Sequence, residues 1–192
     1  MNMAGSRQEY PDISRRENNM ENKKELRQQT LSGERSLFQG QDLRIYDTIF
    51  ADGESPLKES RGIELYSSFF RWKYPLWYSR DILMQDCFLA NTARAGIWYT
   101  DHLRAVSVSI EAPKTFRRCK DLTLEKVTMS DAAETLWSCD GVKMRDVTAK
   151  GDYFAMNSRN MEIDSLELFG NYPFDGAENV VIRNSRLLSK DA

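Results

Sequence analysis

The stretch Leu122-Thr-Leu-Glu-Lys-Val-Thr-Met129 is the clearest copy of an eight-residue pattern that occurs eight times in the chain. Apolar residues occupy its first, third and eighth positions, and mostly polar residues lie between them. Alternation with a period of two places one set of side chains in a core and the other in solvent, as in a β-strand. The other copies begin at Leu43, Ile63, Ile82, Leu103, Val142, Met161 and Val180.

The copies are evenly spaced, with steps of 20, 19, 21, 19, 20, 19 and 19 residues between their starts. One such strand cannot bury its apolar side alone, whereas stacked copies cover one another. The fifth position holds residues that suit a bend: Asp47, Ser67, Asp86, Ser107, Lys126, Asp146, Ser165 and Asn184. The pattern predicts an all-β fold, a single-stranded right-handed parallel β-helix of about eight coils of 19–21 residues, with one bent strand per coil.

Two other repeat folds fit the sequence less well. A leucine-rich repeat has a similar period but calls for an Asn or Cys at a fixed place and often a helix on the return path. The return segments here contain Pro and Gly and show no helical period. A left-handed helix of hexapeptides keeps to multiples of six, and the observed steps do not.

A second repeating feature precedes each copy of the pattern. An apolar residue recurs at Leu37, Leu57, Leu76, Ile97, Phe116, Leu136, Ala155 and Phe174, which predicts a second stacked strand. The residue after it then points outward, at Phe38, Lys58, Trp77, Trp98, Arg117, Trp137, Met156 and Asp175. One long side of the rod is therefore expected to carry aromatic rings interleaved with charges.

Length and composition restrict the domain organisation. The 192 residues suit one β-helix domain, residues 30–192, preceded by a polar tail, residues 1–29. We expect the tail to be disordered. The alternative is a short helix over Glu17–Gln29 that caps the open end of the stack.

Charge and cysteine content exclude several classes of protein. With 27 basic and 29 acidic residues, the net charge of −2 argues against binding to nucleic acid. The sequence lacks both a long apolar run for a membrane span and an apolar signal segment at the N-terminus, so we expect no membrane partner. Three cysteines without a signal segment favour a reducing compartment, and we expect a cytoplasmic protein.

Several segments are distinctive as a set: Phe50-Ala-Asp-Gly-Glu-Ser-Pro-Leu-Lys-Glu-Ser60, Trp72-Lys-Tyr-Pro-Leu-Trp-Tyr78, Gly96-Ile-Trp-Tyr-Thr100, Ala112-Pro-Lys-Thr-Phe-Arg-Arg118, Glu134-Thr-Leu-Trp137, Gly151-Asp-Tyr-Phe154 and Leu187-Leu-Ser-Lys-Asp-Ala192. With them the chain, from about Thr30 onward, resembles a bacterial family of unknown function assigned to the pectate-lyase-like right-handed β-helices. The resemblance implies a protein that handles carbohydrate. It also implies further coils after Ala192, so we expect an uncapped last coil and self-association through it.

The candidate catalytic residues are three carboxylates on successive coils, Glu134, Asp152 and Asp175, with the basic residues Lys114 and Arg117. Carboxylates one and two coils apart would be separated by about 5 and 10 Å, which brackets the spacings of retaining and inverting glycosidases. The alternative is that they form surface ion pairs. No cofactor or metal is expected, except Ca²⁺ on Asp152 and Asp175 if the protein is a lyase.

The candidate binding residues are aromatic and basic side chains on the same side, and an oligosaccharide is the partner they suggest. They are Trp77, Tyr78, Trp98, Tyr99, Trp137, Lys58 and Arg118. The alternative is that the rings stack on one another. The only histidine, His102, is expected to be a solvated turn residue, and Cys119 and Cys139 are expected to be buried thiols on adjacent coils.

Two functions remain open at this stage. The first is a carbohydrate-binding or carbohydrate-active β-helix, a lyase or a glycoside hydrolase, acting along the aromatic and charged face. The second is a non-catalytic scaffold or protein-interaction solenoid. The sequence alone leaves open whether the protein is an enzyme, because β-helices serve both purposes.

Overall fold

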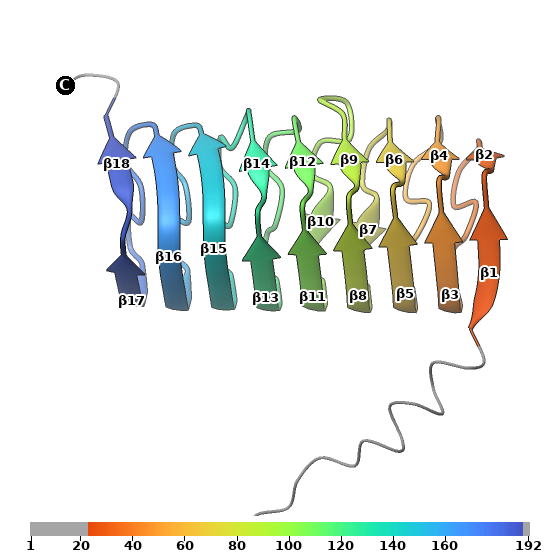
Figure 1. The fold of residues 1–192 in the computed structure, drawn as a ribbon, viewed down its shortest axis with the longest axis horizontal. Coiled ribbons are helices and arrows are strands. Elements are labelled where there is room, and N and C mark those ends of the chain that lie inside the picture. The colour runs from red at the N-terminus through yellow and green to blue at the C-terminus, as the bar shows by residue number, and fades with distance from the viewer. Residues whose placement is uncertain (1–22, 190–192) are drawn as a thin grey trace, which may run out of the picture.

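Parallel strands stacked side by side along one axis form the fold in the computed structural model, which describes residues 23–189 (Figure 1). Nine long strands, one per coil, pair in chain order. They are β1 (Lys24–Arg27), β3 (Gln41–Tyr46), β5 (Arg61–Tyr66), β8 (Arg80–Gln85), β11 (Asp101–Val106), β13 (Lys120–Glu125), β15 (Asp140–Lys150), β16 (Arg159–Phe169) and β17 (Glu178–Arg183). The predicted parallel β-solenoid is confirmed, and its right-handedness stays a prediction.

A bend follows the long strand in each coil, as the fifth position of the pattern predicts. The bend residue has a left-handed backbone, with φ of 48° at Asp47 and 52° at Asp86. A short strand follows, so most coils have two strands where one bent strand was predicted, whereas β15 and β16 run through the bend. The short strands are β2 (Thr30–Leu31), β4 (Ile49–Phe50), β6 (Phe69–Phe70), β9 (Phe88–Leu89), β12 (Ser109–Ile110), β14 (Thr128–Met129) and β18 (Arg186–Leu188).

The predicted second stacked strand exists in the middle of the rod. It consists of β7 (Leu76–Trp77) and β10 (Ile97–Trp98), which pair in parallel, and isolated bridges continue the ladder from Trp98 to Arg117 and from Arg117 to Trp137. Left-handed residues recur at further corners of each coil. The coil of β8, for example, has positive φ at Tyr74, Tyr78, Asp81 and Asp86.

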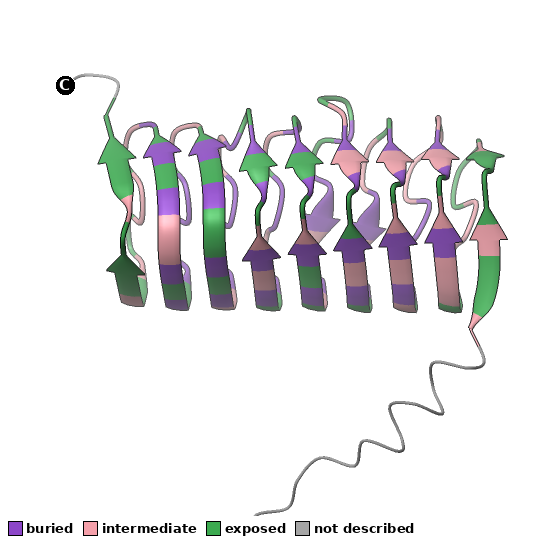
Figure 2. Cartoon of the chain, in the orientation of Figure 1, coloured by how far each residue is buried: buried purple, intermediate pink, exposed green. Residues whose placement is uncertain are grey.

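The core runs down the axis and is built from the apolar positions of the pattern. The register pairs like with like, for example Ile63 with Ile82 and Leu122 with Val142. These side chains are buried in the middle coils, and Figure 2 shows buried and exposed positions alternating along the long strands. Phe50 and Phe70 stack inside with ring centroids 4.4 Å apart. The predicted inward set is therefore correct.

A column of small residues forms the corner before each long strand. The hydroxyl groups of Ser79 and Thr100 donate to the carbonyl oxygens of Leu57 and Leu76, each at 2.8 Å. The Cys119 thiol does the same to the carbonyl of Ile97 at 3.3 Å. Within residues 23–189 all three cysteines are free and buried. Cys119 and Cys139 share this column, as predicted, whereas Cys87 follows the bend residue Asp86 in another column.

The N-terminal boundary of the solenoid was predicted too late. Lys24–Arg27 is a strand paired with β3, so residues 24–29 belong to a first coil and are neither tail nor helix. Leu26 and Leu31 fill the third and eighth positions of the pattern and pack on the core, but the first position is Lys24, which hides the repeat. The rest of the predicted tail, residues 1–22, lies outside the described residues.

The last described coil differs from the others in exposure. Ile182 and Leu187 occupy inward positions yet are 37% and 45% exposed, because no further coil covers them in the described residues. Self-association through this coil stays a prediction.

Truncation of one inward side chain tests the core. Ile163→Ala on β16 should lower the free energy of unfolding by about 2–5 kcal/mol, because it removes buried methyl groups and leaves a cavity. The neighbouring Glu162 is exposed and points outward, so Glu162→Ala should change the free energy of unfolding by less than about 0.5 kcal/mol. Urea denaturation of both variants measures the difference, and equal effects would contradict the assigned faces.

Thiol labelling tests the burial of the three cysteines. Burial raises the pKa of the Cys87 thiol to about 11, and burial beside Cys139 raises the pKa of Cys119 as well. Because the thiolate is the reactive form, a thiol reagent at neutral pH should label no cysteine in the folded protein and all three after denaturation. Rapid labelling of the native protein would contradict this arrangement.

Candidate functional site

Three tryptophans and one arginine stack in a continuous column, which we call the tryptophan ladder (Trp77, Trp98, Arg117 and Trp137). The rings of Trp77 and Trp98 are 5.1 Å apart and nearly parallel, at 6°. The Arg117 guanidinium lies 4.7 Å from the Trp98 ring and 4.7 Å from the Trp137 ring, between the two. The alternative expectation, that the rings stack on each other, is the arrangement observed.

The backbone register produces this stack. Trp77 and Trp98 are direct partners in β7 and β10, and the isolated bridges place Arg117 and Trp137 next in line. The indole N–H of Trp77 donates to the Ala95 carbonyl at 2.6 Å, and that of Trp98 donates to the Lys114 carbonyl at 2.7 Å. The indole N–H groups of Trp77 and Trp98 and the faces that these two rings turn toward each other are thus already used within the protein.

The carboxylate of Glu134 forms ion pairs with Arg117 of the ladder and with Lys114. One of its oxygens accepts a hydrogen bond from Arg117 Nη2 at 3.2 Å, and Lys114 Nζ lies 3.2 Å from its other oxygen. Among the described residues, Arg117 Nε and Thr135 Oγ1 are the buried side-chain polar atoms without a hydrogen-bond partner. The two rings cover the faces of the Arg117 guanidinium, which gives it cation–π contacts on both sides.

A second column runs beside the first, and we call it the tyrosine ladder (Tyr78 and Tyr99). The two rings are parallel within 2° and 4.7 Å apart. Lys58 Nζ lies 5.8 Å from the Tyr78 ring, and the Arg118 guanidinium lies 6.0 Å from the Tyr99 ring. Tyr78 is 51% exposed, so this ladder, unlike the first, presents its edge to solvent.

The three predicted catalytic carboxylates have different surroundings. Glu134 is held by Lys114 and Arg117, as the surface ion-pair alternative anticipated. Asp152 accepts a hydrogen bond from the backbone N–H of Asn171 at 2.9 Å, which joins two coils. Asp175 is exposed in the turn before β17. Within residues 23–189, no three His, Cys, Asp or Glu side chains gather into a metal-binding cluster.

Two separate shallow hollows lie on the corner of the solenoid where the long strands begin, and we call them together the corner groove. Their volumes are about 350 and 270 Å³; the first lies on the coils of β3, β5 and β8 and the second on the coils of β13, β15 and β16, with the coil of β11 between them. The first is lined by Gln39, Gln41, Glu59, Ser60, Arg61, Tyr78 and Arg80, and the second by Arg118, Cys119, Lys120, Ser138, Cys139, Asp140, Asn157 and Arg159.

Sequence reasoning found Tyr78 and Arg118 but missed the opposite wall of this groove. Arg61, Arg80 and Lys120 are the first residues of β5, β8 and β13. Each stands one residue after the small corner residue, a fixed place in the repeat, so their column was visible in the sequence. Asp140 in the same column has a pKa below its ordinary value, because Arg159 and Asn160 donate hydrogen bonds to its carboxylate.

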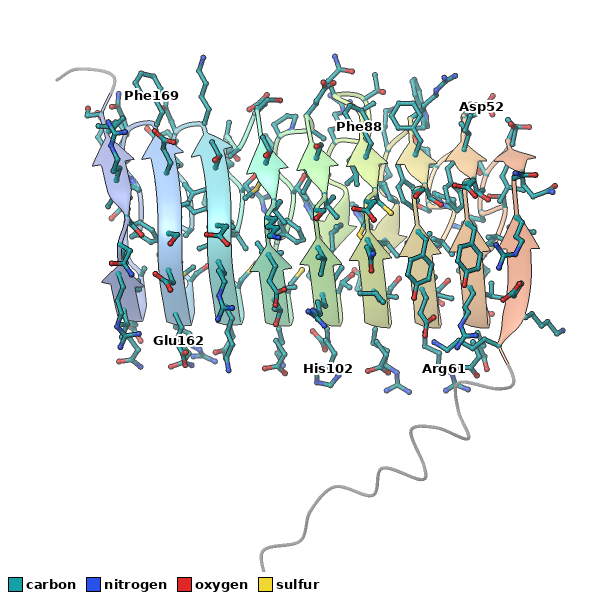
Figure 3. All side chains as sticks on the ribbon, viewed as in Figure 1. Asp52, Arg61, Phe88, His102, Glu162 and Phe169 are labelled. Carbon is teal, nitrogen blue, oxygen red and sulfur yellow. The ribbon has the colours of Figure 1, made fainter. Side chains whose placement is uncertain are left out.

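His102 is the second residue of β11 and not a turn residue before a strand, although its side chain is exposed as expected. Its Nδ1 lies 3.2 Å from Asp81 and its Nε2 lies 3.2 Å from Asp121, on the two neighbouring coils. Figure 3 places it at the edge where the long strands begin, the same edge as Arg61. His102 thus belongs to a ladder of polar side chains, because Asp81, His102 and Asp121 occupy equivalent positions on neighbouring coils.

The fold and these ladders define a parallel β-solenoid whose surface is organised in stacked columns. The chain belongs to the family described as "Protein of unknown function (DUF3737)", whose sequence profile matches residues 24–192. This agrees with the expected family of unknown function, and the pectate-lyase-like assignment stays a prediction. A search of curated proteins found no match.

Two solved structures are similar in fold to this chain. One is HetL, a pentapeptide repeat protein involved in heterocyst differentiation regulation from the cyanobacterium Nostoc sp. strain PCC 7120, with 10% identity, 85% of this chain and 86% of HetL covered, and a TM-score of 0.41. Another is QnrB1, a plasmid-mediated fluoroquinolone resistance protein, with 14% identity, 83% and 94% coverage and a TM-score of 0.30. Among residues 23–189 there is no helix long and apolar enough to cross a membrane.

Replacement of Arg117 tests the tryptophan ladder. Arg117→Lys keeps the charge but loses the planar group between the two rings, so it should lower the free energy of unfolding by about 1–2 kcal/mol. Arg118→Ala, at an exposed neighbour, should change it by less than about 0.5 kcal/mol. Urea denaturation followed by tryptophan fluorescence measures both, and an unchanged stability of Arg117→Lys would show that the stack contributes little.

Proposed function

We propose that this protein is a non-catalytic solenoid that binds a partner protein on the side carrying the two ladders. The observation that carries the proposal is the stacking within the tryptophan ladder, together with the pairing of the Glu134 carboxylate with two cations. Trp77 and Arg117 cover the two faces of Trp98, Arg117 also covers one face of Trp137, and Glu134 is paired with Lys114 and Arg117.

Binding and cleavage of a carbohydrate would require two structural features, an open aromatic face and a pair of carboxylates. A sugar ring stacks on an open aromatic face, whereas the facing sides of Trp77 and Trp98 cover each other. Acid–base cleavage of a glycosidic bond requires two carboxylates facing one substrate. Here Glu134 is bound to two cations and Asp152 to the backbone of Asn171.

The surface beside the closed ladder has the composition of a binding surface. Regular faces of solenoids serve as extended binding surfaces for other proteins. Tyr and Arg are enriched at protein interfaces, and the corner groove and tyrosine ladder bring Tyr78, Arg61, Arg80 and Arg118 together. This side therefore supports recognition of a partner better than it supports chemistry.

Partner capture with paired variants tests the proposal. The double variant Tyr78→Ala/Tyr99→Ala should lose a cross-linked partner that the unaltered protein captures in the cells that produce it, because the tyrosine ladder lies in the contact. The control is Tyr153→Ala/Tyr172→Ala, which removes another exposed stacked tyrosine pair, 5.2 Å apart, on coils nearer the C-terminus. The control should keep the partner.

Enzyme assays complete this test. The purified protein should release neither unsaturated products nor reducing ends from acidic and neutral polysaccharides, with or without Ca²⁺. Turnover that is lost in Glu134→Gln would overturn the proposal in favour of an enzyme. Capture that survives both tyrosine double variants would place the contact on another side of the solenoid.

A further inference from the structure

The corner groove carries an excess of positive charge on a protein whose net charge is −2. Its two hollows are lined by five cationic side chains and two anionic ones, Glu59 and Asp140. The cations are Arg61, Arg80, Arg118, Lys120 and Arg159. A concave surface with an excess of one sign of charge raises the local concentration of ligands of the opposite sign, so these hollows favour an anionic ligand.

The cations differ in how fully the protein itself satisfies them. Arg159 is paired with Asp140, at 2.8 Å from Nη2 and 2.9 Å from Nε. Arg61 Nη2 instead donates to the neutral side-chain oxygen of Gln41 at 2.8 Å. The closest carboxylate contact of Arg80 is a long one, 3.9 Å to Asp81. Arg61 and Arg80 thus retain donors for a carboxylate from outside.

The geometry of the groove suits an extended chain. Arg61 and Arg80 are register partners on β5 and β8, so their backbones are one coil apart, about 4.8 Å. Lys120 stands in the same column two coils beyond Arg80, with Asp101 between them. A ligand that contacts all three must lie along the rod, across several coils.

We propose that the corner groove binds an extended acidic peptide segment of the partner protein, with its carboxylates on Arg61, Arg80, Arg118 and Lys120. This inference rests on the proposed function and names the chemistry of its partner. Guanidinium groups bind carboxylates in a two-pronged geometry, which suits Asp and Glu side chains. A peptide is favoured over an acidic glycan because the facing sides of Tyr78 and Tyr99 cover each other, which leaves less open ring surface for a sugar.

The experiment uses the full chain and a fluorescently labelled peptide of ten glutamates, with anisotropy as the readout. The double variant Arg61→Glu/Arg80→Glu should weaken binding at least about tenfold, because it removes two charge-assisted contacts and adds repulsion. The control is Lys143→Glu/Arg145→Glu, which makes the same change in net charge at two exposed residues of β15 outside the groove. The affinity of the control for the peptide should be within about twofold of that of the unaltered protein. Raised salt should weaken peptide binding by the control and by the unaltered protein.

Each other outcome overturns the inference in a different way. Equal weakening by both double variants would mean that only net charge attracts the peptide. Tighter binding of an oligogalacturonate with the same number of carboxylates would assign the groove to an acidic glycan. Absence of peptide binding at millimolar concentration, together with partner capture that depends on Tyr78 and Tyr99, would refute the acidic peptide and leave the proposed function standing.

Discussion

The structure depends on one constraint, the parallel pairing of each coil with the next in unbroken register. Backbone hydrogen bonds hold equivalent residues of neighbouring coils about 4.8 Å apart, so every side-chain column becomes a stack. Inside the rod this brings Ile63 over Ile82 and Phe50 over Phe70. Outside it creates the tryptophan ladder, the tyrosine ladder and the line of polar residues through His102. Core and surface are two products of the same register.

The fold was largely predictable because the signal repeats. Period-two alternation and steps of 19–21 residues fixed the inward residues of the middle coils, and the bend at the fifth position was foreseen at Asp47 and Asp86. The first coil escaped because Lys24 replaces an apolar residue at its first position, while Leu26 and Leu31 keep the others. A pattern defined by hydrophobicity misses a coil at the end of the rod when a polar residue takes one of its inward positions, as Lys24 does here.

The site was predictable only as a set of columns. The sequence indicated that Trp77, Trp98, Arg117 and Trp137 share a side, but not that the guanidinium inserts between two indoles and closes the stack. That outcome depends on side-chain rotamers and on Glu134 and Lys114 from neighbouring coils, which spacing does not encode. The opposite wall of the corner groove, Arg61, Arg80 and Lys120, was not predicted, because a basic residue at an exposed strand position is no signal by itself. The signal that marks these residues as one column is their common place, one residue after the small corner residue of each coil.

The left-handed corners have a consequence for how such a rod can form. In the coil of β8, four residues that are not glycine, Tyr74, Tyr78, Asp81 and Asp86, adopt positive φ, a conformation that costs roughly 1–2 kcal/mol per residue for a side chain with a Cβ atom. The backbone N–H groups of Tyr74, Tyr78 and Asp86 are each bonded to the following coil, at Arg94, Trp98 and Val106. A lone coil would lack these bonds and would relax. Each coil therefore adopts its bent shape only when it pairs with an adjacent coil that is already folded, so folding is expected to proceed from coil to coil along the rod.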